Sequence, residues 1–107
     1  MGQLTTVINI KDAPKDWLDR PDEFVYIGRS GKGLKSKLGN PYKLRNPKDD
    51  KERALVLKAY KSYFQLKLEF DNGFFVAVAE AAGKTLVCFC KPRECHGDVI
   101  AEFLNDA

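Results

Sequence analysis

Residues 84–104 read KTLVCFCKPRECHGDVIAEFL, and this stretch decides the fold class. Lys84 to Cys90 is apolar and rich in β-branched and aromatic residues, as in a strand that is buried on both faces. After a polar KPRE turn, Cys95 to Leu104 has helical spacing, and we expect its apolar residues to face inward: Val99, Ile100, Phe103 and Leu104. A buried strand that leads into a helix predicts an α/β domain with a parallel sheet.

The rest of the chain supplies further strand and helix patterns. Strands are predicted over 4–10 and 23–28, and helices over 49–70 and 74–82, with Asn72 and Gly73 ending the longer helix. Between the first two strands, we expect a loop or short helical turn that Trp17 pins to the core. We therefore predict one compact α/β domain over residues 1–107, with a small, mainly parallel sheet of three to four strands flanked by helices.

Composition limits the class of protein. The chain has 107 residues, 44% of them hydrophobic and 31% charged, which is typical of a soluble globular domain. Its three cysteines lie within eight positions, an arrangement unlike a secreted disulfide framework. No apolar stretch approaches the roughly 20 residues that span a bilayer, and the start lacks the pattern of a signal peptide. These features predict a cytoplasmic protein with no membrane partner; they leave its oligomeric state open.

The net charge of +3 is unevenly distributed. Residues 29–48 contain seven basic residues and no acidic one, so this segment carries +7 and the rest of the chain −4. We expect it to form a long basic loop. A charge of this size in one segment favours an anionic partner.

The cysteines and the single histidine form the most specific cluster. Cys90 is predicted near the carboxyl end of a strand, where ligands of open α/β sheets bind, whereas Cys88 is expected only to pack. Cys95 lies where the last helix begins, and amide donors there stabilise a thiolate. We expect Cys95 to be the reactive thiol, with Cys90 facing it, His96 as proton donor or acceptor, and Asp98 orienting the imidazole or capping the helix.

A zinc site is the main alternative for this cluster. Cys88, Cys90, Cys95 and His96 make a complete tetrahedral ligand set, and such a closed site would be structural. Adjacent residues at a helix start point in different directions, however, and the paired C-x2-C spacing of structural zinc sites is missing. We therefore predict no cofactor and keep zinc as the alternative.

A glycine-rich turn precedes the basic segment. Gly28 and Arg29 follow a predicted strand, where a backbone without side chains approaches an anion closely and nearby Lys32 adds charge. The spacing fits neither a P-loop nor a dinucleotide fingerprint. We assign a ligand-binding role to Gly28, Arg29 and Lys32, with Arg93 beside the cysteines; Asn40 has either the same role or only that of a turn residue.

These motifs together resemble the family catalogued as domain of unknown function 4326, which occurs in bacteria and their phages. The resemblance rests on VINI at 7–10, VYIGR at 25–29, GNPY at 39–42 and, above all, GKTLVCFC at 83–90 with CHGD at 95–98. Leu38 stands where the family usually has an aromatic residue. The resemblance implies a compact α/β fold and one site that joins Gly28, Arg29, Asn40, Cys90, Cys95 and His96, but it implies no reaction.

The function hypothesis that follows is a small ligand-binding domain with an enzyme-like site. Its ligand would be a nucleotide or another phosphate-bearing molecule, and Cys95 and His96 would carry the chemistry. Two alternatives stay open. One is a non-enzymatic module, of the phage-effector kind, whose basic loop binds nucleic acid or protein; the other is a domain with a structural zinc site.

Overall fold

The computed structural model describes residues 4–28, 34, 36–42, 45–46, 48–89 and 95–106. Within them, three strands form a parallel sheet in the order β1-β3-β2: β1 is Thr6–Asn9, β2 is Phe24–Tyr26 and β3 is Thr85–Cys88. Asn9 lies beside Cys88, and Tyr26 lies beside Val87. The α/β prediction is confirmed, and β3 is the central strand, with its last three residues buried.

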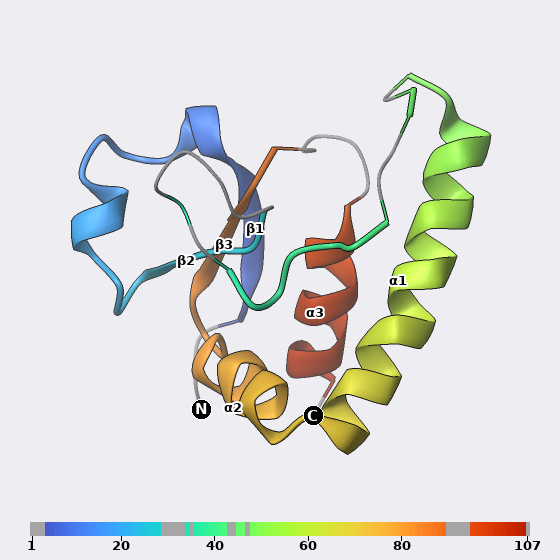
Figure 1. Cartoon of the computed structure of the whole chain (residues 1–107). Coiled ribbons are helices and arrows are strands. Elements are labelled where there is room, and N and C mark those ends of the chain that lie inside the picture. The colour runs from blue at the N-terminus through green and yellow to red at the C-terminus, as the bar shows by residue number, and fades with distance from the viewer. Residues whose placement is uncertain are drawn as a thin grey trace.

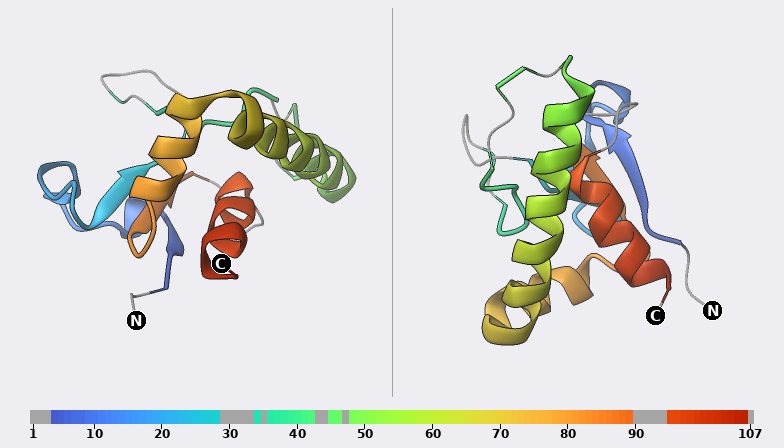
Figure 2. Two further views of the ribbon diagram at one scale, coloured as in Figure 1. Left: turned by 90° about the horizontal axis from the view of Figure 1, so that it is seen from below. Right: turned by 90° about the vertical axis from the view of Figure 1, so that its right-hand side faces the viewer.

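The described residues also form three α-helices: α1 is Asp50–Phe70, α2 is Asn72–Glu80 and α3 is His96–Asn105. Helix α3 contacts both β1 and β3, and α1 packs against α3 and α2. Figures 1 and 2 show α3 between the sheet and α1. The segment between β1 and β2, with its short 3-10 turns at Ile10–Asp12 and Trp17–Asp19, lies on the other side of the sheet.

The helix boundaries follow from local capping. The Asp49 carboxylate accepts hydrogen bonds from the amides of Lys51 and Glu52, so α1 begins where the acidic residues predict. Asp71 ends α1 and also caps α2 by accepting from the amide of Phe74. The prediction that Asn72 and Gly73 lie between the helices is therefore wrong, because they form the first turn of α2. Gly83 ends that region with a φ of 77°.

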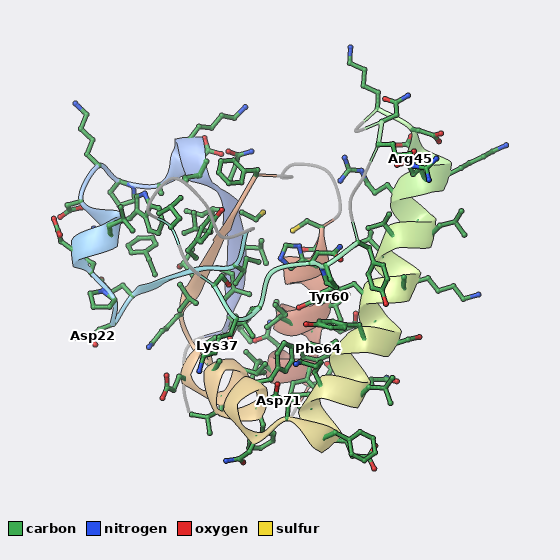
Figure 3. All side chains as sticks on the ribbon, in the orientation of Figure 1. Asp22, Lys37, Arg45, Tyr60, Phe64 and Asp71 are labelled. Carbon is green, nitrogen blue, oxygen red and sulfur yellow. The ribbon has the colours of Figure 1, made fainter. Side chains whose placement is uncertain are left out.

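The core lies between the sheet, α3 and the inner face of α1. Tyr60 and Phe64 point from α1 toward α3 in Figure 3. The largest fully buried side chains also include Ile27, Leu38, Leu86, Val87, Val78 and Ile100. Phe103 differs from the prediction: it is 42% exposed, although one side of its ring packs on Phe64. Among the described helices, none has the length and apolar character needed to cross a membrane.

Candidate functional site

The candidate site lies at the carboxyl edge of the sheet, at the top of Figure 1. Because all three strands are parallel, they end together there: β1 at Asn9, β2 just before Ile27, and β3 at Cys88. Helix α3 begins at the same edge, and Cys95 is its N-cap residue. This arrangement brings two cysteines, the histidine and a buried asparagine together.

A pair of buried thiols is the central feature of this edge. The Sγ atoms of Cys88 and Cys95 are 3.3 Å apart, and both residues are present as thiols rather than as a disulfide. Cys88 is 1% exposed and Cys95 is 2% exposed. Cys88, which was expected only to pack, is therefore the thiol that Cys95 contacts among the described residues. Cys90 lies outside them.

Asp98 shapes the environment of Cys95. Its carboxylate accepts a hydrogen bond from the amide of Cys95 at 3.0 Å, which closes a capping box at the start of α3. Asp98 therefore caps the helix, which is one of the two roles predicted for it.

His96 is buried and fastens two elements together. Its Nε2 donates a hydrogen bond of 2.5 Å to the carbonyl oxygen of Ile27, just beyond the end of β2. Its ring packs against Tyr60 with centroids 5.0 Å apart. With its Nε2 proton held by a backbone carbonyl, His96 positions the start of α3 against β2.

Tyr60 extends this network to the loop before α1. Its hydroxyl donates a 2.9 Å hydrogen bond to the carbonyl oxygen of Leu38. Burial, reinforced by the neighbouring Tyr63 and Cys95, raises the pKa of Tyr60 well above its usual range. The hydroxyl therefore stays protonated and acts as a donor. Leu38 is 2% exposed, so this apolar residue is part of the core.

Gly97 permits the close approach of α3 to the sheet. A Cβ atom on Gly97 would lie 2.6 Å from Cδ1 of Ile27 and 2.9 Å from Cγ1 of Val7. Real Cβ atoms do not come so close to other carbon atoms, so a larger residue would push the start of α3 outward. Sequence reasoning missed this role, for which the glycine within CHGD was the available signal.

Asn9 is a second residue that sequence reasoning missed. It is 8% exposed, and its side-chain amide donates to the carbonyl oxygen of Phe89 at 3.2 Å. The side-chain oxygen Oδ1 of Asn9 accepts a hydrogen bond from the backbone amide of Lys11 at 3.0 Å. Asn9 thus joins the ends of β1 and β3, and the signal was a polar residue at the end of an apolar strand.

A row of aromatic rings continues the edge on the β2 side. The ring centroids of Trp17 and Tyr26 are 6.2 Å apart, and those of Tyr26 and Phe89 are 6.1 Å apart in an edge-on arrangement. Phe89 is 59% exposed although it directly follows a buried strand. An exposed ring supported by other rings is a surface on which a planar group can stack.

The other predicted ligand-binding residues are distributed as follows. Gly28 is buried beside the ring of Tyr26. The side-chain oxygen of Asn40 accepts from the amide of Tyr42 at 2.9 Å, which is the turn role. Arg29, Lys32 and Arg93 lie outside the described residues, as does most of the first half of the basic segment.

A groove of about 930 Å³ lies between α1 and α3, and Cys95 is among its lining residues. Lys58 and Lys61 line it from α1, and Asp98 and Glu102 line it from α3. The right-hand view in Figure 2 shows the two helices that form its walls. Cys95 is 2% exposed, so the groove borders a residue that is almost completely buried.

The described residues include three of the four ligands that the zinc alternative requires. Within the described ranges, no three residues among histidine, cysteine, aspartate and glutamate are placed to hold a metal ion. Cys88 and Cys95 present two adjacent sulfur atoms, whereas Nε2 of His96 points to a backbone carbonyl. Cys90, the remaining ligand of the predicted set, is outside the described part of the chain.

Comparisons with known proteins agree with the sequence resemblance. A family model described as Domain of unknown function (DUF4326) matches residues 8–106. The chain is also 31% identical over 58 residues to a protein of Enterobacteria phage T4, named as an uncharacterized 12.4 kDa protein in the nrdA-td intergenic region. The match spans 54% of each chain, so it covers about half the length of the phage protein. No solved structure matches.

Proposed function

This chain belongs to the DUF4326 family, whose description states no activity, and we propose a function from the site itself. The protein binds a phosphate-bearing ligand, a nucleotide or a nucleic-acid fragment, at the carboxyl edge of its sheet. Cys95 supplies a reactive thiol there. This proposal defines a class of ligand and a reacting group.

The observation that carries the proposal is the exposed ring of Phe89 at the carboxyl edge, next to Tyr26 and Trp17. Parallel α/β sheets bind ligands at this edge, because loops and helix starts converge there. Aromatic rings of this kind stack bases, and each stacked base contributes roughly 1–3 kcal/mol. A nucleobase is a planar ring that can stack on Phe89, and it would bind at the edge where parallel α/β sheets bind their ligands.

Basic residues that are close in sequence to the residues of this edge would bind the phosphate part of the ligand. Arg29 follows Gly28 directly, Lys32 is three residues further, and Arg93 lies between β3 and α3. The first turn of α3 is already capped by Asp98, so these cations are the better phosphate ligands. We assign them this role, with Gly28, which directly precedes Arg29 in the sequence, and with Asn40 holding its turn.

The thiol chemistry is assigned to Cys95. Cys95 is the N-cap residue of α3, at the same carboxyl edge where β1 and β3 end. His96 positions the helix start by binding Ile27, and Asp98 caps it, so both act through Cys95. Cys90, which lies two residues beyond the buried Cys88, is a further candidate thiol for the same reaction.

Titration with adenosine monophosphate tests the binding proposal. Trp17 is the single tryptophan, and its ring packs on Tyr26, so its fluorescence reports on ligands at Phe89. Phe89→Ala should weaken binding roughly 5- to 150-fold, as loss of one stacked base predicts. Phe70→Ala is the matched control, since Phe70 is 77% exposed at the far end of α1. The proposal is wrong if adenosine monophosphate and a short single-stranded oligonucleotide both fail to bind.

The charge of the basic segment favours a second candidate, a non-enzymatic module that binds nucleic acid through residues 29–48. That module predicts an affinity for an oligonucleotide that falls steeply with salt and disappears when Lys32, Lys35 and Lys37 are neutralised together. It also predicts no effect of Cys95→Ser. The enzyme-like site predicts that Cys95→Ser abolishes turnover while leaving most of the affinity.

A further inference from the structure

We propose that Cys88 and Cys95 form a redox-active dithiol, which a peroxide converts reversibly into an intramolecular disulfide. This inference stands on the thiol pair and does not depend on the proposed ligand. In this reaction, Cys95 is the thiol that peroxide oxidises first. Cys88 is the resolving thiol, which forms the disulfide with the oxidised sulfur of Cys95.

The distance between the sulfur atoms is the first argument. They are 3.3 Å apart, and a disulfide bond measures about 2.04 Å, so the atoms need to approach by about 1.3 Å. Cys88 is the last residue of β3, and Cys95 is the residue before the first turn of α3. The adjustment therefore falls at the ends of the two elements rather than in the middle of β3 or α3.

The groove between α1 and α3 assigns the order in which the two thiols react. Cys95 is among the residues that line it and Cys88 is not, although both are almost completely buried, at 2% and 1% exposed. A small oxidant therefore reaches Cys95 first. Cys88 is reached by the oxidised sulfur of Cys95 and by little else, as a resolving cysteine requires.

The reaction balances with hydrogen peroxide as the oxidant. The thiolate of Cys95 attacks one peroxide oxygen, the O–O bond breaks, and the products are a sulfenic acid on Cys95 and hydroxide. The thiol of Cys88 then attacks the sulfenic sulfur; the S–S bond forms, and the sulfenic hydroxyl leaves as water with a proton. Two thiols have lost two electrons and two protons, and one peroxide has become two waters. A dithiol reductant reverses the change by thiol–disulfide exchange.

Simple packing is the competing explanation, because buried cysteines often serve as small apolar residues. Packing predicts that folded protein resists peroxide at both sites and that no particular pair forms on oxidation. The dithiol predicts a single defined pair. Cys90 serves as an internal control, because it is two residues from Cys88 in the same stretch of sequence and unselective oxidation would involve it as well.

The test uses folded wild-type protein that has been reduced, freed of reductant and treated with one equivalent of hydrogen peroxide. Remaining thiols are alkylated under denaturing conditions, and the mass is measured. A disulfide lowers the intact mass by about 2 Da and removes two of the three alkylation sites. Digestion then locates the pair: trypsin cleaves after Arg93 and frees Cys95, and chymotrypsin cleaves after Phe89 and parts Cys88 from Cys90.

The expected product is a peptide containing Cys88 linked to a peptide containing Cys95, which dithiothreitol separates. Cys90→Ser should still form it at the wild-type rate, and Cys88→Ser should leave Cys95 as a sulfenic or more oxidised acid. A dominant bond that involves Cys90 would overturn the proposal. So would oxidation of Cys95 without any bond, or the absence of reaction in folded wild-type protein.

Discussion

Replacing Gly97 with alanine should push the start of α3 away from the sheet. The new Cβ would lie 2.6 Å from Cδ1 of Ile27 and 2.9 Å from Cγ1 of Val7. Ile27 is fully buried and Val7 has a stiff, β-branched side chain, so relieving these contacts requires the neighbouring core or the start of α3 to shift. Overpacking of this kind destabilises proteins by about 1–3 kcal/mol.

A matched control separates this clash from the helix preference of alanine. Gly73 is the second residue of α2, just as Gly97 is the second residue of α3. A Cβ on Gly73 would meet only the Asp71 carboxylate at 3.4 Å and the end of Lys37 at 3.8 Å, which are ordinary contacts. Gly73→Ala therefore reports the backbone effect alone, which is a gain of up to about 1 kcal/mol.

Urea and thermal unfolding measure the difference between the two variants. We expect Gly97→Ala to be less stable than Gly73→Ala by about 1–3 kcal/mol, or roughly 5–15 °C in Tm for a chain of this size. The urea m-value should be unchanged, since both variants fold to the same compact state. If Gly97→Ala is as stable as Gly73→Ala, the close packing of α3 against Val7 and Ile27 is refuted.

Two further predictions concern the buried network around His96. His96→Phe leaves the carbonyl oxygen of Ile27 without its donor, so urea unfolding should show a loss of about 1–3 kcal/mol; a loss below about 0.5 kcal/mol would contradict the hydrogen bond as described. Because burial raises the pKa of Tyr60, the unfolded chain ionises there first, and stability should fall as the pH rises above about 10. Tyr60→Phe should make that fall shallower while lowering stability near pH 7 by about 1–2 kcal/mol, since the carbonyl oxygen of Leu38 also loses a donor; equal slopes for both proteins would show that Tyr60 does not contribute.

Zinc content can be measured on the same preparations. The ligand-set alternative predicts about one equivalent of zinc in untagged protein purified without chelators, and bound zinc would protect the thiols from peroxide. The dithiol predicts peroxide-sensitive thiols in that protein. Elemental analysis before the oxidation experiment therefore decides which chemistry the cysteines carry.

Local patterns in the sequence were sufficient for most of the fold. Helix α1 follows from apolar residues every three to four positions after two aspartates, and β3 follows from one apolar run. These signals lie within single elements, so they need no knowledge of the rest of the chain. The break at Asp71 was misplaced because one residue caps both helices, and the spacing of apolar residues does not register such a double role.

The candidate site was predictable as a region but not as a set of contacts. The carboxyl edge, Cys95 and the capping role of Asp98 follow from the strand and helix pattern around residues 84–98. The sequence does not show which thiol contacts Cys95, because Cys88 and Cys90 share a face in an isolated strand. Only the packing of α3 on β3 places the Sγ of Cys88 next to it.

The sequence by itself determined the class of the fold, the uneven charge and the place where the thiols gather, because these depend on periodicity and composition along short segments. Tertiary structure alone decided that His96 binds Ile27, 69 positions away, that Tyr60 binds Leu38, and that Gly97 admits α3 to the sheet. Such contacts join elements distant in sequence. They are set by how side chains fill the space between the packed elements, and no local pattern records that volume.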